Sequence, residues 1–172
     1  MAVALRVFFL LCGICGLMTG GSADAVVKVP SCPKGYTRVE DRCFIFVHSE
    51  RDFADAQLTC EALGANLASV TSAVENAVIL ELINIAKEDR LAETWIGYND
   101  IATDGTFVWT DGTTPGFTNF DGPAPNDNGP LDCVLINGVV GSPVNPSAPG
   151  PLFWDAVNCD DLHYFVCAKC AE

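Results

Sequence analysis

The sequence predicts an α+β domain in which two helices come first and an antiparallel sheet with long loops follows. Three observations support this fold class. Apolar residues recur at helical spacing in two stretches before residue 87, short β-type runs alternate with turn residues after residue 93, and the chain is rich in cysteine. A length of 172 residues suits one domain with a substantial core.

The first 25 residues have the composition of an export signal. Arg6 is the only charge before an apolar run, Val7 to Met18, that is too short to span a bilayer. Ala23-Asp24-Ala25 provides the small residues of a signal peptidase site. We therefore expect residues 1–25 to be a signal peptide and residues 26–172 to form a secreted, extracellular domain; the alternative is a retained N-terminal anchor. No later stretch is apolar and long enough to be a membrane span.

The formal net charge of −13 limits the classes of partner. Phosphate backbones and anionic lipid surfaces repel such an acidic molecule, so binding to nucleic acid or to membranes is not expected. The net charge therefore argues against both of these classes of partner.

Two helices are predicted after a hairpin that Cys32 and Cys43 tie together. The first helix follows Ser49-Glu50-Arg51-Asp52, which has the form of a capping box, and ends at Gly64. Its predicted inner face consists of Phe53, Ala56, Cys60 and Leu63. The second helix starts at another capping box, Ser72-Ala73-Val74-Glu75. Its predicted apolar stripe consists of Val74, Val78, Leu82, Ile85 and Ala86.

Beyond Glu93 the pattern changes to short strands separated by turns at Asp104-Gly105 and Asp111-Gly112. Two segments rich in Pro and Gly, 113–130 and 137–151, are long loops of the kind that form binding surfaces or disordered insertions. The predicted strands are Thr94–Gly97, Thr106–Trp109, Asp132–Ile136, Phe153–Asp155 and Tyr164–Cys167.

The cysteines that follow the signal segment predict a disulfide framework formed in an oxidising compartment. Six cysteines alone allow 15 pairings, and the sequence does not choose among them. Seven cysteines follow the signal segment, so at least one of them has no partner within the chain; they are Cys32, Cys43, Cys60, Cys133, Cys159, Cys167 and Cys170.

Six ordered motifs extend across the mature chain. They are Cys32-Pro33-Lys34-Gly35-Tyr36, Leu67-Ala68-Ser69-Val70, Trp95-Ile96-Gly97, Val108-Trp109-Thr110-Asp111-Gly112, Asp132-Cys133-Val134 and Phe165-Val166-Cys167. In these motifs the chain resembles the C-type lectin-like domain family, in the long form that has an extra N-terminal hairpin. Short secreted fish lectins and type II antifreeze proteins are the members that it resembles most. The resemblance implies a C-type lectin-like fold for the whole mature chain.

The resemblance also implies a disulfide pairing. Cys32–Cys43 would close the hairpin, Cys60–Cys167 would join the first helix to the last strand, and Cys133–Cys159 would brace the loop region. Cys170 is left over from this pairing. For this residue the alternatives are an interchain bridge in a disulfide-linked homodimer, a glutathione adduct and a reduced thiol.

In sugar-binding members of the family, a Ca²⁺ ion on the long loop is held by side-chain oxygens and by hydroxyls of the sugar. The resemblance places those ligands at Ala124-Pro125-Asn126, at Leu131 and at Trp154-Asp155-Ala156. Of the five expected side-chain ligands, only Asn126 and Asp155 carry oxygen, whereas Ca²⁺ takes about six to eight oxygens. We therefore expect no calcium site unless water or the neighbouring side chains complete the shell, namely those of Asp121, Asp127 and Asn128.

The predicted function is that of a secreted carbohydrate-binding protein with a degenerate calcium site, whose sugar binding is calcium-independent or weak. The alternative is a module that binds ice or a protein ligand through the same surface. For Trp154, core packing next to Cys159 is favoured over the alternative of stacking on a ligand. No nucleophile with a base is visible, so no enzymatic activity is predicted. The candidate ligand-binding residues are Asn126, Asp127, Asn128, Trp154 and Asp155.

Overall fold

The computed structural model describes residues 29–86, 92–120, 131–136 and 153–172. The predicted signal peptide, residues 1–25, lies outside the described residues, as do the loop residues 121–130 and 137–152. The described chain contains two helices and one sheet of eight strands, which confirms the α+β class. Among these residues, no helix is both long enough and apolar enough to cross a membrane.

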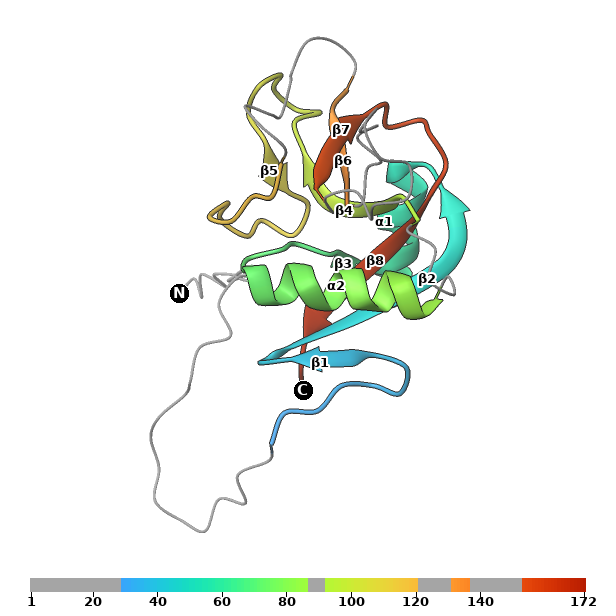
Figure 1. The fold of residues 1–172 in the computed structure, drawn as a ribbon, viewed down its shortest axis with the longest axis vertical. Helices are drawn as coiled ribbons and strands as arrows, with labels where there is room; N and C mark the ends of the chain where they lie inside the picture. Colours follow the sequence, from blue (N-terminus) through green and yellow to red (C-terminus); the bar gives the residue numbers. More distant parts are fainter. Residues whose placement is uncertain (1–28, 87–91, 121–130, 137–152) are drawn as a thin grey trace, which may run out of the picture.

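The strands form one mixed sheet with the order β1-β2-β8-β4-β6-β7, and β3 and β5 pair with β8 and β4 (Figure 1). Neighbouring strands are antiparallel except β4 and β8, which run parallel, whereas antiparallel strands alone were predicted. The parallel pair is possible because a long connection separates these two strands in the chain. The strands are β1 (Thr37–Val39), β2 (Arg42–Arg51), β3 (Asn66–Leu67), β4 (Thr94–Asn99), β5 (Val108–Trp109), β6 (Cys133–Ile136), β7 (Trp154–Val157) and β8 (His163–Cys170).

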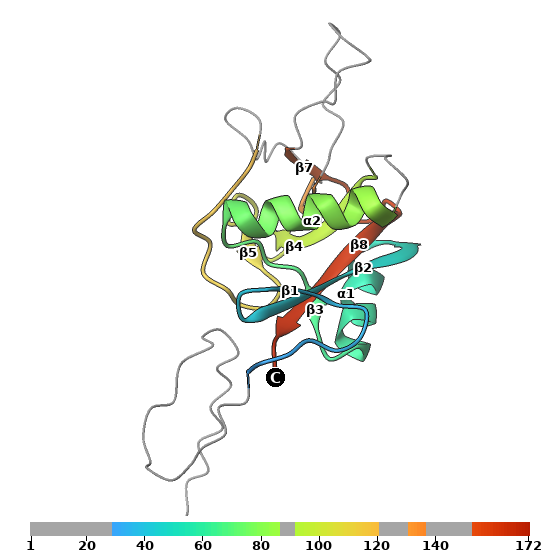
Figure 2. The ribbon, with the colours of Figure 1, turned by 60° about the horizontal axis from the view of Figure 1, so that its bottom comes forward.

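The helices α1 (Phe53–Ala62) and α2 (Ala73–Ala86) cover opposite faces of the sheet. Successive side chains of a strand point to opposite faces. Along β8, Phe165 packs in one apolar cluster with α1, and the next residue, Val166, packs in the other cluster with α2. Figure 2 shows α2 lying across one side of the sheet, with α1 beyond β8. The core therefore consists of two layers, one on each side of the sheet.

The capping residue of α1 is Asp52, whose carboxylate accepts a hydrogen bond from a backbone N–H of the first turn at 2.8 Å. The capping box predicted from Ser49 is wrong, because Ser49 still belongs to β2. Gly64 ends the helix as predicted, with a φ of 66° that suits glycine. Leu63 was predicted on the inner face, but it is exposed because it is the C-cap residue.

Ser72 caps α2 as predicted, since its Oγ accepts a hydrogen bond from the backbone N–H of Glu75 at 3.2 Å. The predicted apolar stripe is wrong at two positions, because Val74 and Ile85 are exposed. Apolar residues occupy most of the helix after Asn76, so their spacing is compatible with more than one buried face. The apolar residues that are buried are Ile79, Leu80 and Ile83.

The disulfides have the pairing that the resemblance implied. Cys32–Cys43 closes the N-terminal hairpin, Cys60–Cys167 joins α1 to β8, and Cys133–Cys159 joins the start of β6 to the residues after β7. Cys170 takes part in none of these bonds, and its side chain is exposed near the end of β8. An interchain bridge in a homodimer stays a prediction.

Candidate functional site

The strands β4 to β7 form the part of the molecule that lies away from β1 and the C-terminus (Figures 1 and 2). We call the described residues 97–120, 131–136 and 153–162 the loop end. Of the predicted site residues, Trp154 and Asp155 belong to the loop end. The other three, Asn126, Asp127 and Asn128, lie outside the described residues, so their position beside Asp155 stays a prediction.

Trp154 is the centre of an aromatic cluster inside the loop end, and it is only 1% exposed. Its indole Nε1 donates a hydrogen bond to Oδ1 of Asn76 on α2 at 2.8 Å, and its backbone N–H donates to the carbonyl of Asn119 at 2.9 Å. Trp154 therefore holds three parts of the chain together, and its burial agrees with the core-packing interpretation. Its ring packs at centroid distances of 5.6 to 6.1 Å against those of Tyr98, Trp109, Phe117 and Phe120.

Asp155 is exposed on β7, directly after the buried Trp154. It pairs with Leu135 of β6, and its Oδ1 accepts a hydrogen bond from the backbone N–H of Ala156 at 3.0 Å. Because side chains alternate along the strand, Ala156 faces the core and Asp155 faces solvent. A carboxylate acceptor is thus exposed to solvent on β7.

Asp100, which was not among the predicted site residues, is a buried acid at the loop end with an exposed fraction of 2%. Its Oδ2 accepts a hydrogen bond from the backbone N–H of Gly105 at 2.8 Å, but its Oδ1 has no partner among the described residues. Burial raises the pKa of Asp100, and the negative charges of Asp132 and Asp104 raise it further. The hydrogen bond from the backbone N–H of Gly105 lowers this pKa, but by less than burial raises it. Its place between a buried strand and an Asp-Gly turn could have drawn attention to it.

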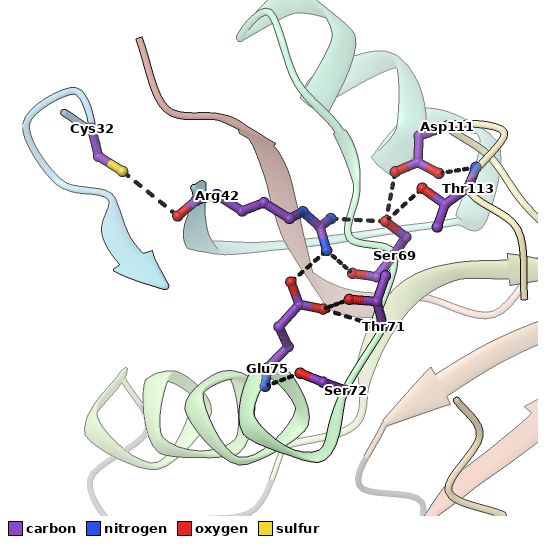
Figure 3. A network of polar contacts seen from close by, with 8 residues as sticks. All are labelled: Cys32, Arg42, Ser69, Thr71, Ser72, Glu75, Asp111 and Thr113. Atoms are coloured by element: carbon purple, nitrogen blue, oxygen red, sulfur yellow. Dashed lines mark hydrogen bonds and ion pairs between the residues drawn. The ribbon is translucent and has the colours of Figure 1, made fainter. Parts of the chain in front are cut away.

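A polar network fixes the base of the loop end to the rest of the domain (Figure 3). The guanidinium of Arg42, on β2, donates to Glu75 of α2 at 2.7 Å and to the Oγ and carbonyl of Ser69 at 2.8 and 3.1 Å. Ser69 in turn donates to Asp111, just after β5, at 2.6 Å. The second carboxylate oxygen of Glu75 accepts hydrogen bonds from Thr71. Sequence reasoning missed this network, whose members lie far apart in the chain.

Gly97 brings β4 close to two other segments. A Cβ at this position would lie 2.5 Å from Oγ1 of Thr110 and 2.8 Å from the carbonyl oxygen of Leu67. Any larger residue would therefore push the loop end away from β3. The glycine of the Trp95-Ile96-Gly97 motif has this packing role.

Comparison with known proteins identifies the family. The lectin C-type domain family matches residues 49–169, a range that includes both helices and the whole loop end. The chain belongs to the C-type lectin domain family. The fold and the loop end described above are therefore those of a C-type lectin domain.

Two relatives and one solved structure show how this lectin domain compares with others. Nattectin, a galactose-specific lectin of Thalassophryne nattereri, is 32% identical over 140 residues, which are 81% of this chain and 80% of nattectin. A type-2 ice-structuring protein of Osmerus mordax is 32% identical over 153 residues, 89% of this chain and 78% of that protein. The structure of herring type II antifreeze protein matches with a TM-score of 0.70 and 29% sequence identity. The match covers 82% of this chain and 100% of the antifreeze protein chain.

These comparisons confirm the predicted resemblance to fish lectins and type II antifreeze proteins. The matched family is a lectin domain family, and the relatives are named as a lectin, an ice-structuring protein and an antifreeze protein, so the prediction of a non-enzymatic protein is confirmed as well.

The described residues of this lectin domain do not fit a calcium ion. Leu131 and Ala156 carry no side-chain oxygen, and Ala156 points into the core. Within the described ranges, no group of three or more His, Cys, Asp or Glu side chains could hold a metal. Ca²⁺ takes about six to eight oxygen ligands, far more than Asp155 supplies. The other candidate ligands, Asp121, Asn126, Asp127 and Asn128, lie outside the described residues, so the expected absence of a calcium site stays a prediction. The binding chemistry considered below uses the protein's own side chains.

Proposed function

We propose that this protein is a secreted carbohydrate-binding lectin whose binding surface is the loop end around Asp155, with calcium-independent or weakly calcium-dependent binding. The observation that carries the proposal is the exposed Asp155 carboxylate, held on β7 directly beside the buried Trp154. An ionised carboxylate accepts hydrogen bonds from sugar hydroxyls, and bonds to a charged group are among the stronger ones. A platform that is already rigid lowers the entropic cost of binding.

Two features support secretion. The three disulfides are typical of proteins that fold in an oxidising compartment. The apolar run in residues 1–25 has the length and the flanking residues of a signal peptide.

Ice binding is the second candidate, favoured by the likeness to an ice-structuring protein and by surface threonines. An ice-binding face requires hydroxyls that are turned outward together. Two of the six loop threonines are turned inward instead, since Thr110 Oγ1 donates to the carbonyl of Leu67 and Thr113 Oγ1 is 3.4 Å from Ser69 Oγ. This arrangement favours the carbohydrate over ice. The six threonines are Thr103, Thr106, Thr110, Thr113, Thr114 and Thr118.

A glycan array with the mature domain, probed with and without EDTA, tests the proposal. We expect binding to neutral sugars that the chelator leaves unchanged. Asp155→Ala should weaken the affinity about tenfold, the effect of losing a hydrogen bond to a charged group of roughly 1.5 kcal/mol. Glu81→Ala is the matched control, because Glu81 is an exposed carboxylate on α2.

Three results would count against the proposal. Absence of binding to every glycan, combined with shaping of ice crystals, would favour the second candidate. Binding that EDTA abolishes would overturn calcium independence. Equal loss of affinity in both variants would remove Asp155 from the site.

A further inference from the structure

The charges of this protein are divided unequally along the chain. All nine Lys and Arg residues lie outside the segment from Leu91 to Ala168, which carries ten carboxylates. This segment therefore accounts for −10 of the net charge of −13. The remaining residues carry twelve carboxylates against nine cations, which is close to balance. The acids of the segment are Glu93, Asp100, Asp104, Asp111, Asp121, Asp127, Asp132, Asp155, Asp160 and Asp161.

The division along the chain is also a division in space. The acidic segment supplies β4 to β7, and with them the loop end, whereas Arg38 belongs to β1 and Lys169 to the end of β8, at the opposite end of the domain (Figure 1). Arg51 is an exception, because it pairs with His163 at the end of β2, and the backbone N–H of Phe53 donates to the carbonyl of Cys159 at the edge of the loop end. Within the described ranges, the carboxylates of the loop end form no ion pair with Lys or Arg. Asp104 and Asp155 are exposed there, and even the buried Asp100 has no cation as partner.

The absence of cations matters for ligands that carry a negative charge. Proteins recognise carboxylate, sulfate and phosphate groups mainly through Arg and Lys. The undescribed segments 121–130 and 137–152 contain neither residue type, so they bring no cation to the loop end. The undescribed segment 87–91, which precedes β4, contains Lys87 and Arg90, and their position is outside the described residues. A negative group bound at Asp155 would meet the like charge of that carboxylate well within the screening length of about 8 Å at physiological ionic strength.

We infer that the loop end selects uncharged glycans and rejects sialylated, sulfated and phosphorylated ones. This inference rests on the proposed carbohydrate-binding function and specifies its ligand class. The loop end provides acceptors for neutral hydroxyls at Asp155 and offers anionic sugars no charged donor. Anionic bacterial polymers fall into the excluded class for the same reason.

The test compares matched pairs of soluble oligosaccharides, each a neutral glycan and its sialylated or sulfated derivative, by calorimetry at low and high salt. We expect the wild type to bind the neutral member at least tenfold more tightly at low salt. This ratio should fall as salt screens the surface charges.

Leu131→Lys supplies the missing cation, because Leu131 is 37% exposed at the start of the Asp132-Cys133-Val134 strand. The variant should bind the anionic member several-fold more tightly than the wild type does. Val74→Lys is the matched control, an exposed aliphatic residue on α2 that gains the same charge away from the loop end. Its neutral-to-anionic ratio should equal that of the wild type, which separates a local effect from a change in net charge.

Equal or tighter binding of the anionic glycans by the wild type would overturn the inference and leave the proposed function intact. Absence of binding to every member of the pairs, by protein that circular dichroism shows to be folded, would overturn both. If Leu131→Lys fails to fold, the salt dependence of the wild-type ratio decides the question by itself.

Discussion

The loop end and the opposite half of this lectin domain, which we call the scaffold end (residues 29–86 and 163–172), are held together by different forces. At the scaffold end, β2 and β8 pair along most of their length and Cys60–Cys167 ties α1 to β8. No strand of the loop end is as long as β2 or β8: β4 has six residues, β5 has two, and β6 and β7 have four each, and Cys133–Cys159 joins β6 to the residues after β7. The cluster of aromatic rings around Trp154 replaces much of the missing sheet.

This difference has a consequence for binding. Aromatic packing and buried hydrogen bonds do not depend on surface charge. The loop end can therefore keep its structure although the described carboxylates on its surface form no ion pairs with Lys or Arg. Its surface residues are then available for ligand recognition. The scaffold end, in contrast, uses Arg42 and Glu75 inside its own structure.

The largest expected effect on stability comes from removing the disulfide that joins α1 to β8 at the scaffold end. Cys60→Ala with Cys167→Ala removes a crosslink with a sequence separation of 107 residues. We expect a loss of about 4 to 5 kcal/mol in the free energy of unfolding, because the bond limits the entropy of the unfolded chain. Urea denaturation measures the loss. Cys32→Ala with Cys43→Ala spans only 11 residues and should cost less; a larger cost for this pair would contradict the argument.

The next effect concerns the junction of the two ends. Arg42→Met leaves the carboxylate of Glu75, which is 7% exposed, without its cation and should cost about 3 kcal/mol. Arg42→Met combined with Glu75→Met removes both charges and should recover part of this loss. Urea denaturation of the two variants measures which of them is more stable. A double variant that is less stable than the single one would show that packing of the Arg42 stem, and not its charge, matters here.

Local patterns predicted much of this fold, because helix caps, turns and strand alternation depend on neighbouring residues. Ser72 and Gly64 act as their sequence context indicated. The buried face of α2 could not be chosen, since Val74 and Ile85 fit an apolar stripe as well as the residues that are buried. The disulfide pairing came from the family resemblance, as number and spacing leave it open.

The parts of the site that sequence reasoning missed depend on contacts between distant residues. Ser69 and Asp111 are 42 positions apart, and Arg42 and Glu75 are 33 apart. No local motif links such residues before the chain is folded. For Asp100 only the tertiary structure shows the burial and the unpartnered oxygen.

A smaller loss of stability is expected from Trp154→Phe, and this variant tests most directly whether the two ends can be destabilised separately. Trp154→Phe removes the indole donor to Asn76 and should cost about 1 to 2 kcal/mol. Trp95→Phe is the matched control, because Trp95 is also buried and its Nε1 donates to the carbonyl of Arg51 at 2.9 Å. Both variants should lose similar stability in urea. Only Trp154→Phe should speed amide hydrogen exchange at residues 117–120 and weaken glycan binding; equal changes in both would show that the two ends unfold as one unit.

The smallest effect concerns Asp100 at the loop end. Its pKa is raised in the folded state by burial, so folding favours the protonated form. The stability that Asp100 contributes is therefore present in acid and is lost as the pH rises through the folded-state pKa. Asp100→Asn removes this loss and keeps an acceptor for the N–H of Gly105.

The free energy of unfolding of Asp100→Asn should thus equal that of the wild type in acid and exceed it by about 1 kcal/mol at neutral pH. Urea unfolding at several pH values measures this difference. Asp104→Asn is the control, since the exposed Asp104 contributes to the raised pKa only through its charge. Its effect should be in the same direction but smaller. A difference between Asp100→Asn and wild type that does not change with pH would mean that the buried carboxylate is compensated in the folded protein. The loop end would then tolerate its negative charges without loss of stability.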